Sequence, residues 1–481
     1  MTETVSRRDF LGATAGGILL AGGLAARPLQ AAEQAGWPTM PPVQIQVVYL
    51  GTGGGAWPKP EFDAPAEVAK FQRYLADVQQ RLGDVRFVGG QLIPNEVPAA
   101  AQLAAKLGDA DALLLIHLSF GDATPFLKFV ETGLPTAIFS QPFSGHDWMY
   151  IPAWQKDGQR VILTASSDYA DLDRAVALLR VPVRMRQTRI LLIGSAAGTE
   201  AGQKAEQIRA RLGPEVIPVS VAEMVAAHRT VAANAAVAEA EAYWLSQAKQ
   251  VVEPSRDEVV KSAAMYLAMK KLMIERGARA ITIRCLGGIP IDTLGYPCLG
   301  FSKLNDLGLV GACEADMDST LTMLMFGYAF GIPGFISDPL FDTSKNAVIH
   351  AHCVAPTKMD GPAGARAPFL IRSHRDDNRG ASLEAELRVG QEITCAKLAN
   401  LDTMLISTGK IIALPDFDDR GCRTQIVTEV ADARAMLANW GSGVLPKDMM
   451  TLLHRVVFYG NRLDAVRDMA ILMGQQVVIE G

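Results

Sequence analysis

The sequence predicts an α/β protein with two successive Rossmann-like, doubly wound α/β domains, followed by a mostly antiparallel, β-barrel-like C-terminal domain. Short apolar runs alternate with helical patterns from Val43 to about Arg184, and the alternation starts again near Arg189. Parallel neighbouring strands need a crossover connection, so this alternation indicates βαβ units. After about Asp342, Pro, Gly and charged residues separate short β-like pieces, which favours antiparallel pairing.

The N-terminal α/β domain is expected over residues 40–184. Each predicted strand is a short apolar run, and each predicted helix carries apolar residues at helical spacing. The strands are expected at Val43–Leu50, Val85–Val88, Ala112–His117 and Thr136–Ser140, and the helices at Pro65–Leu82, Pro98–Leu107 and around Pro125–Glu131.

The central α/β domain is expected over residues 185–342, with the link to the first domain near residues 180–188. Its strands are expected at Ile190–Ile193, Val216–Val221 and Ala280–Arg284, and its helices at Glu200–Leu212, Pro254–Glu275 and Met317–Phe330. Met265, Met269 and Met273 recur at every fourth position of one helix and are interpreted as core.

The C-terminal domain is expected over residues 343–481. Its β-like pieces are Phe369–Arg372, Ser382–Arg388, Glu392–Leu398 and Thr403–Leu414, and it closes with a helix at Leu463–Met473 and a strand at Gln476–Glu480.

Composition and charge exclude several classes of protein. The chain has 481 residues, 49% of them hydrophobic and 20% charged, with 43 Gly and 26 Pro, as an ordinary globular protein has. Gly and Pro are too scattered for a collagen-like or disordered chain. The net charge of −5 argues against a nucleic-acid binder, whose electrostatic footprint would be basic.

The N-terminus has the layout of an export signal. Arg7 and Arg8 precede a Gly/Ala-rich apolar run, Gly12–Ala26, and the small residues Ala31 and Ala32 follow. The paired arginines and the weakly hydrophobic run are typical of a twin-arginine signal peptide at residues 1–32. The run is shorter than the ~20 residues that a membrane span needs, so we expect cleavage, a periplasmic or otherwise exported protein, and no stable membrane insertion.

The six cysteines all lie in the C-terminal half, with no CxxC pair. A small disulfide scaffold would be shorter and richer in cysteine. The twin-arginine route carries proteins that have already folded in the cytosol, so we expect reduced and mostly buried thiols. One or two disulfides remain an open alternative.

Gly51 to Ala56 formally fits the G-x-G-x-x-A fingerprint of dinucleotide-binding proteins. That fingerprint works only where a helix begins at once and points its N-terminus at the pyrophosphate. Here Pro58 and Pro60 follow, so no such helix begins. We interpret the segment as a glycine loop and expect no nicotinamide cofactor.

Carboxylates follow two apolar runs of the central domain. Glu314 ends the run Leu307–Cys313, and Asp338 ends a second run, with Pro339 directly after it. Ligands of open α/β sheets bind outside the carboxyl ends of strands, so both residues are candidates to bind a metal and move protons. Asp316 and Asp318 are explained by their place at the start of a helix.

His350 and His352 lie in the apolar run Ala347–Val354. In a strand they share a face, which suits a divalent metal. The alternative is that the imidazoles are buried and bonded to backbone carbonyls. A metallohydrolase using both histidines is therefore one functional hypothesis, and it would make the two equally important.

Several short motifs, in order, resemble the L-fucose isomerase family and its L-arabinose isomerase relatives. They are Pro297 to Gly308 (PCLGFSKLNDLG), Cys313 to Asp316 (CEAD), Ser337 to Pro339 (SDP), His352-Cys353, and Leu453 to Leu463 (LHRVVFYGNRL). The resemblance is clear over roughly residues 280–481, and before that it rests on architecture alone.

The resemblance implies a Mn²⁺-dependent aldose–ketose isomerase that assembles as a homo-oligomer, a hexamer by analogy. Glu314 and Asp338 would bind the metal and act as acid and base, and His454 would complete the site. His352 would match a further histidine of the arabinose isomerases. The reaction would move a proton between C1 and C2 of the open-chain sugar through a cis-enediol.

Four further residues are candidates for substrate binding. Ser373 and His374 in the C-terminal domain could touch the sugar. His117 and His146, at the ends of first-domain segments, could form part of a neighbouring subunit's substrate wall, as N-terminal domains do in this family. Solvated loops and local packing are the respective alternatives. An exported, non-catalytic sugar-binding protein is the remaining functional hypothesis, because two α/β domains around a cleft also describe periplasmic binding proteins.

Overall fold

The computed structural model describes residues 36–51, 62–119, 121, 123–142, 144–375, 377–415, 421–445 and 449–480. The predicted signal peptide at residues 1–32 and residues 52–56 of the predicted glycine loop lie outside these ranges. In the part of the chain that the structure describes, no helix is long and apolar enough to cross a membrane.

The first sheet contains five parallel strands in the order β2-β1-β3-β4-β5. These strands are β1 (Val43–Leu50), β2 (Val85–Ile93), β3 (Ala112–His117), β4 (Thr136–Ser140) and β5 (Val161–Ala165), and the last of them is absent from the sequence prediction. The connecting helices are α3 (Ala64–Leu82), α4 (Val97–Ala104), α5 (Thr124–Val130) and α6 (Ile151–Lys156), and α7 (Tyr169–Gln187) leads out of the sheet.

The second sheet contains four parallel strands in the order β10-β9-β6-β7. They are β6 (Arg189–Ile193), β7 (Glu215–Val219), β9 (Ala280–Ile283) and β10 (Val310–Ala312). The helices around them are α8 (Ala205–Arg211), α9 (Val221–Arg229), α10 (Ala233–Ala240), α11 (Arg256–Arg276), α12 (Cys285–Gly288), α13 (Ile291–Leu294), α14 (Cys298–Asp306) and α15 (Met317–Phe330), with η3 (Glu241–Leu245) after α10. The predicted methionine stripe of α11 is confirmed as core, because Met265, Met269 and Met273 are all fully buried.

The C-terminal strands form a closed, mostly antiparallel sheet. β15 pairs with both β16 and β18, so the order β15-β18-β11-β12-β17-β16 returns to its start, and β19 adds to β16 in parallel. The strands are β11 (Phe335–Asp342), β12 (Ala347–His352), β15 (Glu392–Ala399), β16 (Thr403–Ala413), β17 (Thr424–Glu429), β18 (Arg455–Tyr459) and β19 (Gln476–Ile479). The α/β class with a strand-rich, mostly antiparallel C-terminal region is thus confirmed.

A small sheet of three strands joins the central part of the chain to the C-terminal part. Its strands are β8 (Gln250–Val251), β13 (Phe369–Arg372) and β14 (Ser382–Ala385), and β13 pairs in parallel with β8.

The sequence predicted that Asp338 ends its strand, and this prediction is wrong. β11 continues through Pro339 to Asp342 and pairs with β12, where Asp338 lies opposite Ala351. Its pairing with β18 stops at Ser337. Proline is tolerated here because, beyond Ser337, one side of β11 has no ladder partner to which a backbone N–H would donate. Asp338 therefore lies where β11 and β18 separate.

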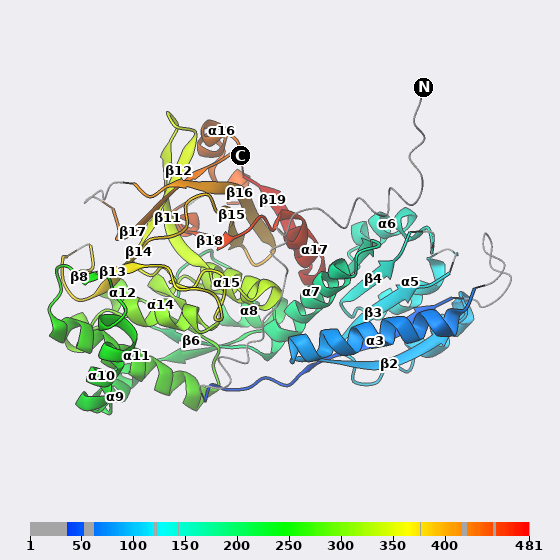
Figure 1. Cartoon of the computed structure of the whole chain (residues 1–481), viewed down its shortest axis with the longest axis horizontal. Coiled ribbons are helices and arrows are strands. Elements are labelled where there is room, and N and C mark those ends of the chain that lie inside the picture. Colours follow the sequence, from blue (N-terminus) through cyan, green and yellow to red (C-terminus); the bar gives the residue numbers. More distant parts are fainter. Residues whose placement is uncertain are drawn as a thin grey trace, which may run out of the picture.

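Helix α7 connects the first sheet to the rest of the molecule. It packs against α15 and against α17 (Leu463–Met473), and Figure 1 shows α7 and α17 side by side between the first sheet and the barrel. Arg180 of α7 is buried, donates to Asp84 at 2.7 Å, and donates to the Tyr328 carbonyl of α15 at 2.8 Å. One continuous apolar core consequently runs from the first sheet through these helices to the barrel.

Asp468 of α17 gives the fold a measurable pH dependence. Burial raises the pKa of its carboxyl to about 6 from an ordinary value of 3.8. The folded state therefore holds this proton more tightly than the unfolded state, and the protein loses stability as the pH rises from about 4 to about 6. We expect Asp468→Asn to raise the free energy of unfolding at pH 8 by on the order of 1–2 kcal/mol, seen as a higher urea midpoint, and to leave it unchanged near pH 4.

The matched control is Asp464→Asn, because Asp464 lies on the same helix with its side chain largely exposed. Equal midpoints for Asp468→Asn and the unchanged protein at pH 8 would contradict this account of the buried carboxyl.

Candidate functional site

Glu314 lies in a strained turn directly after β10. The turn η4 (Cys313–Ala315) has positive φ angles at two consecutive non-glycine residues, 61° at Glu314 and 58° at Ala315. Such a conformation costs on the order of 1–3 kcal/mol for each residue and persists only where the surroundings hold it. Here Ala197 holds it, since its N–H donates to the Ala315 carbonyl at 2.9 Å and its carbonyl accepts from Met317 N–H at 3.0 Å.

The barrel brings three further side chains to Glu314. Asp338 is on β11, His352 ends β12, and His454 directly precedes β18, which pairs with β11. The His454 Nε2 lies 3.6 Å from Glu314 Oε2 and 3.3 Å from Asp338 Oδ1. The His352 Nε2 lies 3.5 Å from Glu314 Oε1. Four residues predicted from the sequence thus form one cluster.

Several polar atoms of this cluster are buried without a hydrogen-bond partner. They are Asp338 Oδ1, both ring nitrogens of His352 and the Nε2 of His454. A buried polar atom without a partner is costly, so such atoms in a native protein call for a ligand. Ligand atoms of Asp338, His352 and His454 all lie within 4.8 Å of one another. The donor set therefore fits a divalent cation, and its mix of oxygen and imidazole suits Mn²⁺.

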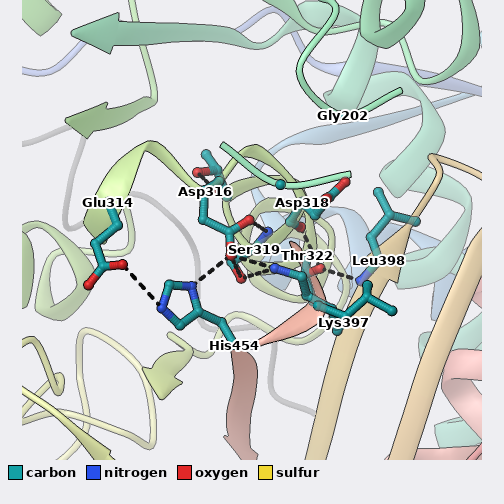
Figure 2. A network of polar contacts seen from close by, with 12 residues as sticks. Gly202, Glu314, Asp316, Asp318, Ser319, Thr322, Lys397, Leu398 and His454 are labelled. Carbon is teal, nitrogen blue, oxygen red and sulfur yellow. Dashed lines mark hydrogen bonds and ion pairs between the residues drawn. The ribbon is translucent and has the colours of Figure 1, made fainter. Parts of the chain in front are cut away.

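Asp316 and Lys397 hold His454 in its orientation (Figure 2). Asp316 caps α15 by accepting from Ser319 N–H at 3.0 Å, and its Oδ2 lies 2.8 Å from His454 Nδ1. Lys397 of β15 is fully buried and donates to both Asp316 and Ser319. With Nδ1 engaged, the Nε2 of His454 is turned toward Glu314, which is how an outer carboxylate orients a metal-binding imidazole.

The pKa values follow from this crowding of opposite charges. Burial by itself would raise the pKa of Glu314, but the imidazoles of His352 and His454 outweigh burial and keep the pKa below its usual value. For His454, burial favours the neutral form, yet the carboxylates Asp316 and Asp338 raise its pKa to about 9. A cation that binds the cluster must therefore displace protons.

His350 does not join the cluster. It lies inside the barrel, where its Nδ1 is 2.9 Å from Ser337 Oγ and its Nε2 is 3.6 Å from Cys395 Sγ. Burial lowers the pKa of His350 to about 3, so its imidazole is neutral. Among the described residues, the groups with metal-ligand spacing include His352 and leave out His350, so the structure gives the paired-histidine hypothesis no support.

A cavity of about 410 Å³ opens on Glu314, Asp316 and His454. This volume falls in the range of small-molecule sites. Its other lining residues include Gln203, Arg284, Thr451 and, on the apolar side, Met450 and Leu453.

Arg284 follows β9 and passes close to two glycines. A Cβ atom at Gly194 would approach Arg284 Cβ to 2.8 Å, and one at Gly288 would approach Arg284 Cγ to 2.8 Å. Because both residues are glycines, there is room for the aliphatic part of the Arg284 side chain beside the cavity.

The contacts of Ser373 and His374 are with residues outside the Glu314 cluster. The Ser373 hydroxyl accepts from Arg423 Nη2 at 2.6 Å, and the His374 ring stacks on Tyr296 with centroids 4.1 Å apart. These contacts support packing of the loop after β13. The predicted contact of both residues with substrate stays a prediction.

His117 ends β3 and His146 precedes the turn η2 (Asp147–Met149), so both belong to the carboxyl edge of the first sheet, and Figure 1 shows β3 and β4 apart from the barrel strands β11 and β12. His117 is buried, with its Nδ1 2.9 Å from Asp147 Oδ1. His146 lies beside Trp148, which is 61% exposed. Their predicted place in a neighbouring subunit's substrate wall stays a prediction.

The sequence reasoning missed Lys397, Arg284 and Gln203, and it explained Asp316 by helix capping alone. Lys397 did carry a signal, since it is the single charged residue in the apolar run Ile393–Ala399. A lysine in such a run is almost never fully buried unless it is paired, so a buried carboxylate partner could have been expected. Nothing in the sequence around Gln203 indicates that it reaches this cavity.

No protein-family model matches the chain. Among curated proteins, however, the sequence has relatives of one kind. It is similar to sulfoquinovose isomerases. The identity is 25% over 227 residues with the enzyme of Clostridium sp. (strain MSTE9), covering 46% of this chain and 47% of that protein. It is 24% over 264 residues with the enzyme of Alkalicoccus urumqiensis, covering 50% and 56%, and 24% over 203 residues with that of Priestia aryabhattai, covering 40% and 44%. The chain thus spans about half the length of the curated relatives that it matches.

Lys397 should be essential for the stability of this site. Lys397→Met leaves Asp316 buried with its charge only partly compensated, and breaking a buried ion pair from one side costs about 3–5 kcal/mol. We expect a large fall in the urea midpoint of unfolding, which is measured by tryptophan fluorescence. Lys410→Met is the control, because Lys410 lies on the neighbouring strand β16 and is exposed. Equal midpoints for the two variants would refute the role given to Lys397.

Proposed function

We propose that this protein is a metal-dependent aldose–ketose isomerase. The observation that carries the proposal is the meeting of Glu314, Asp338, His352 and His454. Buried polar atoms of the last three have no hydrogen-bond partner. The similarity to sulfoquinovose isomerases supports the same reaction class. A cavity that opens on Glu314 and His454 provides room for a sugar.

Glu314, Asp338 and His454, with His352, would hold a Mn²⁺ or similar divalent ion. When bound, that ion supplies Lewis acidity, which polarises the sugar carbonyl and acidifies the neighbouring C–H. The cluster that we assign to it joins residues of η4 and of three barrel strands or their ends. Removal of the metal with EDTA is therefore expected to abolish activity.

We assign the two proton transfers of the reaction to different residues, the one between carbon atoms to Glu314 and the one between oxygen atoms to Asp338. Glu314 lines the cavity and has a lowered pKa, so as an anion it can take the proton from C2 and return it to C1 through a cis-enediol. Asp338 is positioned to exchange the hydroxyl proton between O1 and O2. Asp316 and Lys397 act only through His454, by fixing its ring.

The substrate class that we propose is a sugar with an anionic substituent. Arg284 lines the cavity that contains Glu314, and a guanidinium is well suited to bind a sulfonate, carboxylate or phosphate with two hydrogen bonds. The relatives are named for sulfoquinovose, a sulfonated sugar, which agrees with this chemistry.

We further propose that the protein acts after export by the twin-arginine route and assembles as a homo-oligomer, a hexamer by resemblance. Arg7, Arg8 and the apolar run Gly12–Ala26 support export. A neighbouring copy would place first-sheet residues such as the exposed His146 near the site.

Deuterium exchange tests the reaction. The mature protein with Mn²⁺ is incubated in D₂O with pooled aldopentoses, 6-deoxyhexoses and sulfoquinovose, and proton NMR follows ketose formation and deuterium at C2. Glu314→Gln and Asp338→Asn should each lower both signals by at least about a thousandfold while leaving the fold intact, because general acid–base groups contribute about 10²–10⁴-fold and these residues also bind the metal. Full activity in both variants would refute the assignment. Tight sugar binding that survives EDTA, without any exchange, would identify a sugar-binding protein instead.

Arg284→Gln tests the substrate class. We expect kcat/KM for an anionic sugar to fall about tenfold to a thousandfold, since a lost charge-assisted hydrogen bond costs about 1.5–3 kcal/mol and the guanidinium can make two. Turnover of a neutral aldose should change little. Arg211→Gln is the comparison variant, because Arg211 lies on α8 with an exposed side chain. An equal loss for neutral and anionic sugars would exclude anion recognition by Arg284.

A further inference from the structure

Two buried thiols lie beside the proposed catalytic cluster. Cys285 follows β9 and Cys313 follows β10, the two adjacent parallel strands whose carboxyl ends also carry Arg284 and Glu314. The two side chains are 2% and 3% exposed, and their Sγ atoms are 3.4 Å apart. The isomerase mechanism proposed above uses neither thiol.

The sulfur separation is close to that of two thiolates on one zinc ion. With Zn–S bonds of about 2.3 Å at tetrahedral angles, two sulfurs lie about 3.8 Å apart. A disulfide would instead need an S–S distance of about 2.05 Å. The pair in the structure is thus nearer to the geometry of a shared metal than to that of a covalent bond.

Two more potential ligands lie beside Cys313. Cys313 Sγ, a Glu314 carboxylate oxygen and a His352 ring nitrogen all lie within 4.8 Å of one another. His352 is 3% exposed, and neither ring nitrogen has a hydrogen-bond partner. Its Nε2 is 3.5 Å from Glu314 Oε1, against about 3.4 Å for nitrogen and oxygen ligands on tetrahedral zinc.

We propose that Cys313, Glu314 and His352, joined by the Cys285 thiol beside Cys313, form a second metal site, specific for zinc or another thiophilic divalent cation. Thiolate ligands select soft metals, whereas Asp338 and His454 favour harder ones. Each thiol releases its proton to solvent when the metal binds. The two sites share Glu314 and His352, and one ring nitrogen of His352 can bind only one cation, so a metal in the second site takes this ligand from the first. Zinc in the second site therefore displaces the catalytic ion and inhibits. The inhibition rests on the proposed isomerase function, but the binding does not.

Cadmium alone is the probe for binding, because its bonds to thiolates absorb in the ultraviolet. The mature protein, with all residues after the predicted signal peptide, is reduced, freed of metal and titrated with Cd²⁺. We expect an absorbance that saturates at one equivalent per chain and is lost by more than half in Cys313→Ser and in Cys285→Ser. Cys395→Ser is the matched control, since Cys395 is an equally buried thiol inside the barrel. No absorbance in the unchanged protein, or equal absorbance in all variants, would overturn the proposal.

Circular dichroism checks that each serine variant is folded, and having two variants keeps the test decisive if one of them fails to fold. The competition is tested separately, by adding zinc to the Mn²⁺-loaded protein and comparing each variant with itself without zinc. One equivalent should inhibit the unchanged protein at least tenfold and the Cys285→Ser protein less than twofold. Cadmium absorbance in a protein without isomerase activity would defeat the proposed function and leave the second site standing. Activity without cadmium absorbance would do the reverse.

Discussion

The candidate site depends on one buried chain of charges, Lys397 to Asp316 to His454. Lys397 is fully buried on the barrel wall, and Asp316 begins the helix that follows the second sheet. Their interaction therefore joins the two halves of the site while satisfying an ammonium and a carboxylate that would be prohibitively costly to bury separately. The orientation of His454, and with it the place where the barrel meets Glu314, follows from this contact.

The same region stores strain. Glu314 and Ala315 occupy left-handed conformations that neither side chain favours, and backbone bonds from Ala197 hold them there. In addition, buried polar atoms of Asp338, His352 and His454 have no hydrogen-bond partner, although these side chains lie close to one another. A protein with no use for this arrangement would be more stable without it, so the strain and the unpaired atoms together argue for a ligand in this place.

The sequence predicted most of the elements, because their apolar runs and helical spacing are local signals. It also singled out Glu314, Asp338 and His352 from their places at strand ends or on a strand face, whereas His454 rested on the family resemblance alone. It placed Asp338 at a strand end, since local chemistry could not show that β11 stays paired with β12 through Pro339 after its pairing with β18 stops at Ser337. Lys397 and Arg284 were missed for a related reason. Their roles depend on segments distant in the chain that only the fold brings together.

The closure of the barrel limits where insertions and deletions can be tolerated in this sequence. Asp338 and His352 lie on paired strands, and side chains alternate between the two faces of each strand. Inserting a single residue within β12 would turn His352 to the opposite face, and a closed sheet has no free edge at which the register could slip and recover. Additions and losses of residues should therefore accumulate in the loops, where relatives of low identity can differ in length while the spacing of the cluster stays constant.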